Sequence, residues 1–273
     1  MPETIFNTLK IHWESYGEKA PLLLISGVGG GTWTWQESIE AWSPYFRVIV
    51  FDNIGAGRSS MPDRPYTMAE MADHAAAVLD AAGVKHAGVV GLSMGGMIAQ
   101  ELTLRHPDRV RRLVLGSTHC GISRRIPPDP DIIKQFADNH GLSPEEIFDK
   151  NLLLLVTPRF LKKGSAALKR YKERELRAPL QPDYALNRQL GAIAGFDACG
   201  RIHKIHVPTL ILTAEKDKLV PPGNGRLLSS QIPGAVEKSF AGAGHLIHLE
   251  CAEEFHQMVM QFFHDAGGVV GSR

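Results

Sequence analysis

The chain has 273 residues, of which 44% are hydrophobic and 22% charged, an ordinary composition for a globular protein. Its 30 Lys and Arg residues nearly balance 29 Asp and Glu residues, so a net charge of +1 gives no electrostatic reason to expect nucleic-acid binding. No apolar run reaches the roughly 18 residues that span a bilayer, and the N-terminal residues lack a secretory signal pattern. The sequence therefore predicts a cytoplasmic protein without nucleic-acid or membrane partners.

Strands and helices alternate along both ends of the chain. Residues 8–15 alternate between apolar and polar side chains, as an edge strand does. The later, short apolar runs predict strands that are covered on both faces. In chain order the predicted strands are 8–15, 21–25, 48–51, 87–90, 110–115, 208–213 and 236–240. The predicted helices are 67–82, 94–104, 225–231 and 252–263. This alternation predicts an α/β fold, with a mostly parallel central sheet flanked by helices.

Local sequence signals mark both ends of the helix predicted over 67–82. Thr67 followed by Glu70 predicts a helix start with a capping box, and Gly83 predicts the end of that helix. The glycine-rich tail 267–273 is expected to be loose.

The alternation stops between residues 121 and 200. This stretch has the pattern of helices and loops, with proline-rich breakers at 127–130 and 179–182. We expect a helical cap, or lid, inserted between two strands. The core domain would then be formed by residues 1–120 and 201–273.

The segment 91–95, Gly-Leu-Ser-Met-Gly, matches the pattern G-x-S-x-G between a predicted strand and a predicted helix. In that setting the serine occupies a tight turn that exposes its hydroxyl above the sheet, and this is the setting in which the motif forms a nucleophile elbow. Ser93 is therefore the candidate nucleophile.

A serine nucleophile needs a histidine base, and the histidine needs an acid. Asp217 and His245 each follow a predicted strand, in the chain order that this arrangement requires. Glu215 is the rival acid and His248 the rival base. Strand context and the glycines before His245 favour Asp217 with His245.

These segments, together with 26–30 and 52–59, resemble the α/β-hydrolase superfamily over nearly the whole chain outside the cap. Within it, the chain looks most like the branch of 3-oxoadipate enol-lactonases and small carboxylesterases. The resemblance implies an oxyanion hole made by the backbone amides of Val28 and Met94. It also favours Asp217, because Pro221 matches the Asp-x-x-x-Pro spacing of the family. The chain departs from many members at Ser26, where they carry histidine.

The expected activity is that of a serine hydrolase, which cleaves a small ester, thioester or lactone without a cofactor or a metal. The same triad suits C–C bond hydrolysis of ring-fission products and cofactor-free perhydrolase or haloperoxidase-like chemistry. A non-catalytic ligand sensor on the same fold is a further alternative. A small-molecule acyl substrate is the expected partner, and a homo-oligomer is compatible with the sequence.

Two tryptophans and two arginines are further candidates for substrate contacts, and the cysteine spacing bears on the redox state of the thiols. Trp33 and Trp35 follow the loop at 26–30, where they could line a pocket or pack in the core. Arg124 and Arg125 stand at the start of the cap, where they could meet a substrate carboxylate or remain solvated. The three cysteines are Cys120, Cys199 and Cys251, and their wide spacing predicts reduced thiols or small core residues rather than a disulfide framework or a zinc site.

Overall fold

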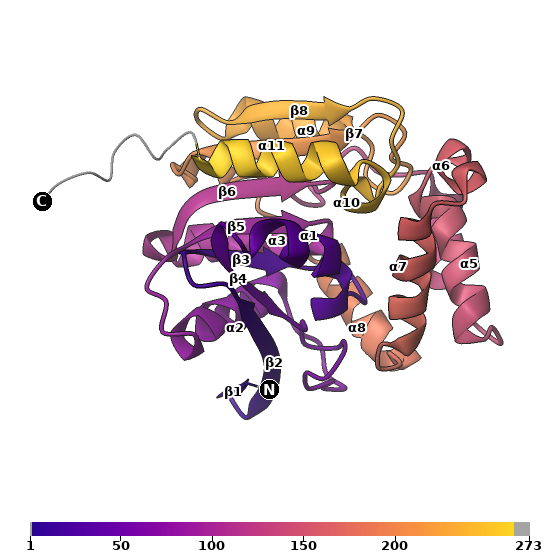
Figure 1. Ribbon diagram of the computed structural model, residues 1–273, viewed down its shortest axis with the longest axis horizontal. Coiled ribbons are helices and arrows are strands. Elements are labelled where there is room, and N and C mark those ends of the chain that lie inside the picture. The colour runs from indigo at the N-terminus through magenta and orange to yellow at the C-terminus, as the bar shows by residue number, and fades with distance from the viewer. Residues whose placement is uncertain (1, 265–273) are drawn as a thin grey trace, which may run out of the picture.

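The computed structural model describes residues 2–264, and its central feature is one eight-stranded sheet with helices on both faces (Figure 1). In sheet order the strands are β1 (Glu3–Phe6), β2 (Leu9–Tyr16), β4 (Phe46–Phe51), β3 (Ala20–Ile25), β5 (Ala87–Leu92), β6 (Val110–Gly116), β7 (Thr209–Ala214) and β8 (Val236–Phe240). The pairs from β4 to β8 are parallel, whereas β1 and β2 pair antiparallel. The predicted mostly parallel α/β fold is confirmed. The sequence did not reveal β1, and the tail 267–273 lies outside the described residues.

Alternate residues of the inner strands β3, β4, β5, β6 and β7 belong to two hydrophobic cores, one on each face of the sheet. In β3, Leu23 and Ile25 pack on one face and Leu22 and Leu24 on the other. The first face is covered by α2 (Met68–Ala81), α3 (Met94–Arg105) and α9 (Gly223–Gln231). The second is covered by α1 (Gln36–Trp42) and α11 (Ala252–His264), and α11 crosses in front of the sheet in Figure 1. Full burial of each such side chain contributes about 1.5–3 kcal/mol, so the strand pattern strongly specifies the register.

Helix α2 begins as predicted, but with half of the expected capping box. The Thr67 side chain accepts a hydrogen bond from the Glu70 backbone N–H at 3.2 Å. The Glu70 carboxylate pairs with Arg64 at 2.5 Å, which gives it a cationic partner in place of the Thr67 backbone N–H. Gly83 follows the helix with a φ of 68°, a left-handed conformation that glycine adopts without strain.

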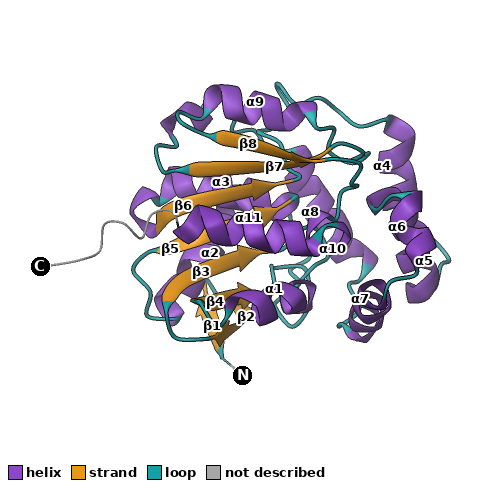
Figure 2. Cartoon of the chain, turned by 45° about the horizontal axis from the view of Figure 1, so that its top comes forward, coloured by secondary structure: helices purple, strands orange, loops and turns teal. Residues whose placement is uncertain are grey.

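Residues 121–200, which we call the cap segment, leave the sheet after β6 and return before β7. Their helices are α4 (Pro130–Ala137), α5 (Pro144–Leu155), α6 (Pro158–Lys163), α7 (Ala166–Arg177) and α8 (Asp183–Ala194). In Figure 2 the arrowheads of β6, β7 and β8 point toward α4 to α6. The cap segment therefore lies beyond the carboxyl ends of the strands, where ligands bind in open α/β sheets. No helix among the described residues is long and apolar enough to cross a membrane.

The prediction that the cysteines are unpaired thiols was wrong for two of them. Cys120 and Cys199 form a disulfide, with their Cα atoms 4.8 Å apart, whereas Cys251 has a free thiol. The bridged residues are 79 positions apart in the chain, but the cap segment returns to the place where it left. The Ala198 N–H donates to the Cys120 carbonyl at 2.7 Å, which holds the two chain ends side by side. The spacing of the two cysteines in the sequence does not reveal that the chain returns to this place.

Candidate active site

Ser93 lies in the strained turn that the G-x-S-x-G pattern predicts. It lies between β5 and α3, with a φ of 54° and a ψ of −121°. This backbone conformation costs about 1–3 kcal/mol for a non-glycine residue. A Cβ on Gly91 would come 2.3 Å from the Gly95 carbonyl oxygen, and one on Gly95 would come 2.0 Å from the Ile25 carbonyl oxygen. Only glycine fits at both positions, so the motif reflects the close approach of strand and helix.

His245 and Asp217 meet through a hydrogen bond of 2.7 Å between Nδ1 and Oδ2. The other oxygen of Asp217 accepts from the backbone N–H groups of Leu219 and Val220, both at 2.9 Å. These three bonds orient the Asp217 carboxylate toward the imidazole. Glu215 instead accepts a hydrogen bond from the Gly242 N–H and is exposed. The structure therefore brings Asp217, and not Glu215, to His245.

The loop that carries His245 is tied to the sheet and to the cap segment. The Ser117 hydroxyl donates to the His245 carbonyl at 3.1 Å. The Glu250 carboxylate accepts from the Gly244 N–H at 3.0 Å and from the Thr157 N–H at 3.2 Å. Because Thr157 belongs to the cap segment, one carboxylate holds the histidine loop and the cap together.

His248, the rival base, is buried and has no hydrogen-bond partner for either ring nitrogen among the described residues. Burial, with the nearby His245, His256 and Arg174, lowers the pKa of His248 to about 3. The ring centroid lies 5.9 Å from that of Trp35. His248 is therefore a neutral side chain in an aromatic environment and does not contact Asp217.

The loop at 26–31 passes beside Ser93. A Cβ on Gly27 would lie 3.3 Å from the Cβ of Ser93. The Ser26 hydroxyl donates to the Gly31 carbonyl at 3.0 Å and so closes the loop. Serine thus has a structural use here, at the position where many members of the superfamily carry histidine. Met94 is the first residue of α3, so its N–H has no acceptor within the helix.

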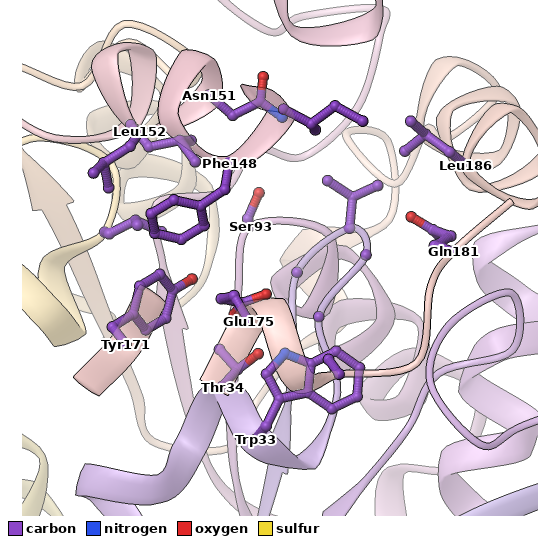
Figure 3. Close-up of a pocket in the computed structure, with 18 of the residues that line it drawn as sticks. Trp33, Thr34, Ser93, Phe148, Asn151, Leu152, Tyr171, Glu175, Gln181 and Leu186 are labelled. Carbon is purple, nitrogen blue, oxygen red and sulfur yellow. The ribbon is translucent and has the colours of Figure 1, made fainter. Parts of the chain in front are cut away.

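Ser93 and His245 line a cavity of about 370 Å³ between the sheet edge and the cap segment. Figure 3 shows Ser93 among the residues that line it. Trp33 and Trp35 also line it, and Trp35 is at the same time fully buried in the core on the second face of the sheet. Arg124 and Arg125 do not belong to the described lining. The Arg124 guanidinium instead reaches the Gln231 side chain at 3.3 Å. The structure therefore does not support a contact between these arginines and a substrate carboxylate.

Sequence reasoning missed the polar side chains that the cap segment contributes near this site. Glu175 lines the cavity from α7, and Gln189 of α8 accepts a hydrogen bond from the Gly29 N–H. Glu175 stands in a run of charged residues, which is typical of a solvated helix face. One sequence signal for the inward position of Glu175 was Tyr171, an aromatic residue four positions earlier and therefore on the same face of α7.

Comparison with known proteins identifies the family of the chain. Residues 20–252 match the model of the α/β-hydrolase fold family. Over 262 residues the chain is 31% identical to carbamate hydrolase RutD of Azorhizobium caulinodans, covering 96% of this chain and 98% of that protein. A solved structure described as an N-acyl homoserine lactone degrading enzyme is 29% identical with a TM-score of 0.82, covering 96% of this chain and 100% of that one. The enol-lactonase of Burkholderia xenovorans is 24% identical with a TM-score of 0.85, over 96% and 99% of the two chains, and shares the fold. The chain therefore belongs to the α/β-hydrolase fold family and is a hydrolase.

Proposed function

We propose that this hydrolase cleaves small esters, thioesters or lactones through an acyl-enzyme formed on Ser93. The observation that carries the proposal is the bond between His245 Nδ1 and Asp217 Oδ2, in a cavity that Ser93 also lines. Because that bond occupies Nδ1, the other ring nitrogen is the one that can accept the serine proton.

In the first half of the reaction, Ser93 Oγ attacks the acyl carbon and His245 Nε2 takes the serine proton. The negative charge that develops on the carbonyl oxygen is stabilised by the amides of Val28 and Met94, each such donor being worth about 3 kcal/mol. Asp217 stabilises the imidazolium. The bond to the leaving oxygen or sulfur then breaks, and His245 returns the proton to the leaving group.

In the second half, water attacks the acyl carbon while His245 accepts one of its protons. The bond to Ser93 breaks, the serine regains a proton from His245, and the free acid leaves. We propose that the cap segment acts as a lid and limits the access of water to the cavity during these steps. Lactones fit the same scheme, because the leaving alcohol stays attached to the acyl group.

The test is labelling with a small fluorophosphonate, followed by mass spectrometry of the native chain and three variants. Stoichiometric label on Ser93 is expected in the native chain, with none in Ser93→Ala and a strong loss in His245→Ala. His248→Asn is the matched control and should keep its label, since its ring does not touch Asp217.

Unlabelled native chain is then assayed on a panel of esters, thioesters, lactones, carbamates and ring-fission diketones, with the labelled, inactivated chain as the control. A folded native chain without label would contradict the proposal and leave ligand binding as the function of the cavity. Label on another residue would assign the nucleophile to that residue instead of Ser93.

A further inference from the structure

The segment 244–250, which carries His245, packs against the sheet on one side and against the cap segment on the other. Ile247 belongs to the core on the second face of the sheet. Leu249 is buried in a separate cluster, and Leu246 packs against that cluster. The other buried members of the cluster all come from the cap segment: Leu152, Val156, Phe160 and Tyr171. In Figure 1, α10 (Ile247–Glu250) accordingly lies between α11 and the cap helices α6 and α7.

The backbone on both sides of His245 touches the backbone of the cap segment. A Cβ on Gly244 would come 2.8 Å from the Leu155 carbonyl oxygen and 2.9 Å from the Val156 Cα, so only glycine fits before the histidine. The Leu246 N–H, after the histidine, donates to the same Leu155 carbonyl at 3.2 Å. A displacement of the cap segment at 155–156 would therefore move the peptides that flank His245.

The Glu250 carboxylate completes this contact. One of its oxygens accepts from the Gly244 N–H at 3.0 Å and from the Thr157 N–H at 3.2 Å. The other oxygen accepts from the Thr157 hydroxyl. Hydrogen bonds to an ionised acceptor are about twice as strong as neutral ones, so these three donors restrain the glycine before His245 relative to the start of α6.

We propose that Glu250 and Thr157 are positioning residues for His245, so that the docked cap segment sets the place of the catalytic base as well as covering the cavity. Neither residue belongs to the described lining of the cavity, so both act through the backbone at 244–246. A shift of a catalytic group by about 1 Å lowers a rate by roughly 100-fold. The inference rests on the proposed function, because it concerns the base of that reaction.

The first test measures kcat and KM on one nitrophenyl ester. Glu250→Ala should lower kcat by ~10–100-fold and change KM by less than ~3-fold, because a misplaced base weakens transition-state stabilisation and not substrate binding. Glu250→Gln should stay within ~5-fold of the native kcat, since its amide oxygen accepts both N–H groups and its amide nitrogen donates to the Thr157 hydroxyl. Glu254→Ala, a nearby exposed acid, is the matched control. A native kcat in Glu250→Ala, or a loss confined to KM, would overturn the proposal.

The second test asks whether the cap residue acts through Glu250. Thr157→Val should lower kcat by ~3–10-fold, whereas Thr157→Ser should keep it, because serine retains the hydroxyl. In the Glu250→Ala background, Thr157→Val should cost less than ~2-fold more, since its partner is already gone. Arg188→Ala removes an exposed ion pair between the cap segment and Asp63, and it controls for loosening of the cap elsewhere. Additive losses from Glu250→Ala and Thr157→Val would overturn the coupling.

The third test needs no acyl transfer. Proton NMR follows the downfield signal of the His245 Nδ1–H in its bond to Asp217, which His245→Ala identifies by its loss. Glu250→Ala should broaden or shift this signal, and Thr157→Val gives the same test if Glu250→Ala does not fold. An unchanged signal in the folded variant would overturn the positioning role. Failure of fluorophosphonate labelling in the native chain would overturn the serine-hydrolase proposal but leave this spectroscopic result intact.

Discussion

The side-chain oxygen of Gln189 accepts a hydrogen bond of 2.9 Å from the backbone N–H of Gly29. This bond joins helix α8 of the cap segment to the loop beside Ser93. Gln189 has no exposed surface, and its Nε2 donates to the Ile54 carbonyl at 2.8 Å. Since Val28 directly precedes Gly29, the same glutamine restrains the peptide next to the proposed oxyanion donor. Gln189 is therefore a positioning residue.

We expect Gln189→Ala to lower kcat by ~10–100-fold with little change in KM, because loss of alignment at one oxyanion donor removes transition-state stabilisation. The rate of fluorophosphonate labelling should fall in parallel. Gln135→Ala, an exposed glutamine of the cap segment, is the control. An increase in KM with unchanged kcat would show that Gln189 acts on substrate binding instead.

The two candidate acids give opposite predictions. Asp217→Asn should lower kcat by ~10⁴-fold, because the amide cannot hold the imidazole tautomer or stabilise the imidazolium. Glu215→Gln should stay within ~3-fold of the native chain, since its contact is to the Gly242 backbone and surface substitutions have small effects. Steady-state kinetics on one ester measures both. The reverse order of losses would assign the acid to Glu215.

The disulfide is expected to stabilise the fold. Cys120→Ala with Cys199→Ala should lower the free energy of unfolding by roughly 2–4 kcal/mol, since the bridge closes a long loop in the unfolded chain. Urea unfolding with and without reductant measures this, and Cys251→Ala serves as the control. If three thiols react in the unfolded, unreduced native chain, the bridge is absent in solution.

His119 predicts an acid-sensitive contribution to stability. Burial, with the nearby Arg125 charge, lowers the pKa of His119 from 6.5 to about 4. Below pH 6.5 the unfolded chain therefore binds a proton that the native ring does not, and stability falls as the pH decreases toward 4. His119→Leu should reduce the loss of unfolding free energy between pH 7 and pH 5 by about 2 kcal/mol. Urea titrations at both pH values test this against the exposed control His140→Leu, and an unchanged difference would contradict it.

The local requirements of the site could be predicted because sequence patterns encode them. The glycines beside Ser93 are required by contacts within a few residues, and Asp217 follows a buried strand whose apolar run is visible in the sequence. The strand pattern likewise specified the parallel sheet. Strand β1 was missed because it is a short edge strand with alternating exposed residues, and such strands lack a continuous apolar run.

Features that depend on the path of the cap segment could not be predicted. Glu175 and Gln189 are ordinary surface residue types by pattern, and their burial or cavity position follows from where α7 and α8 dock. The position of Arg124 at the start of the cap segment left open whether it meets a substrate or remains solvated, and in the structure its guanidinium donates to the Gln231 side chain. The prediction that Cys120 and Cys199 are not disulfide-bonded was wrong for the same reason.

The closeness of Cys120 and Cys199 has a consequence for how this architecture can vary. Because the excursion leaves and re-enters within 4.8 Å, its length and internal helices place almost no geometric demand on β6 and β7. A different helical insert with the same two ends could be exchanged at this junction while Ser93, Asp217 and His245 keep their places after β5, β7 and β8. Substrate range can thus change with the insert, provided that a new insert also restrains the Gly29 N–H as Gln189 does.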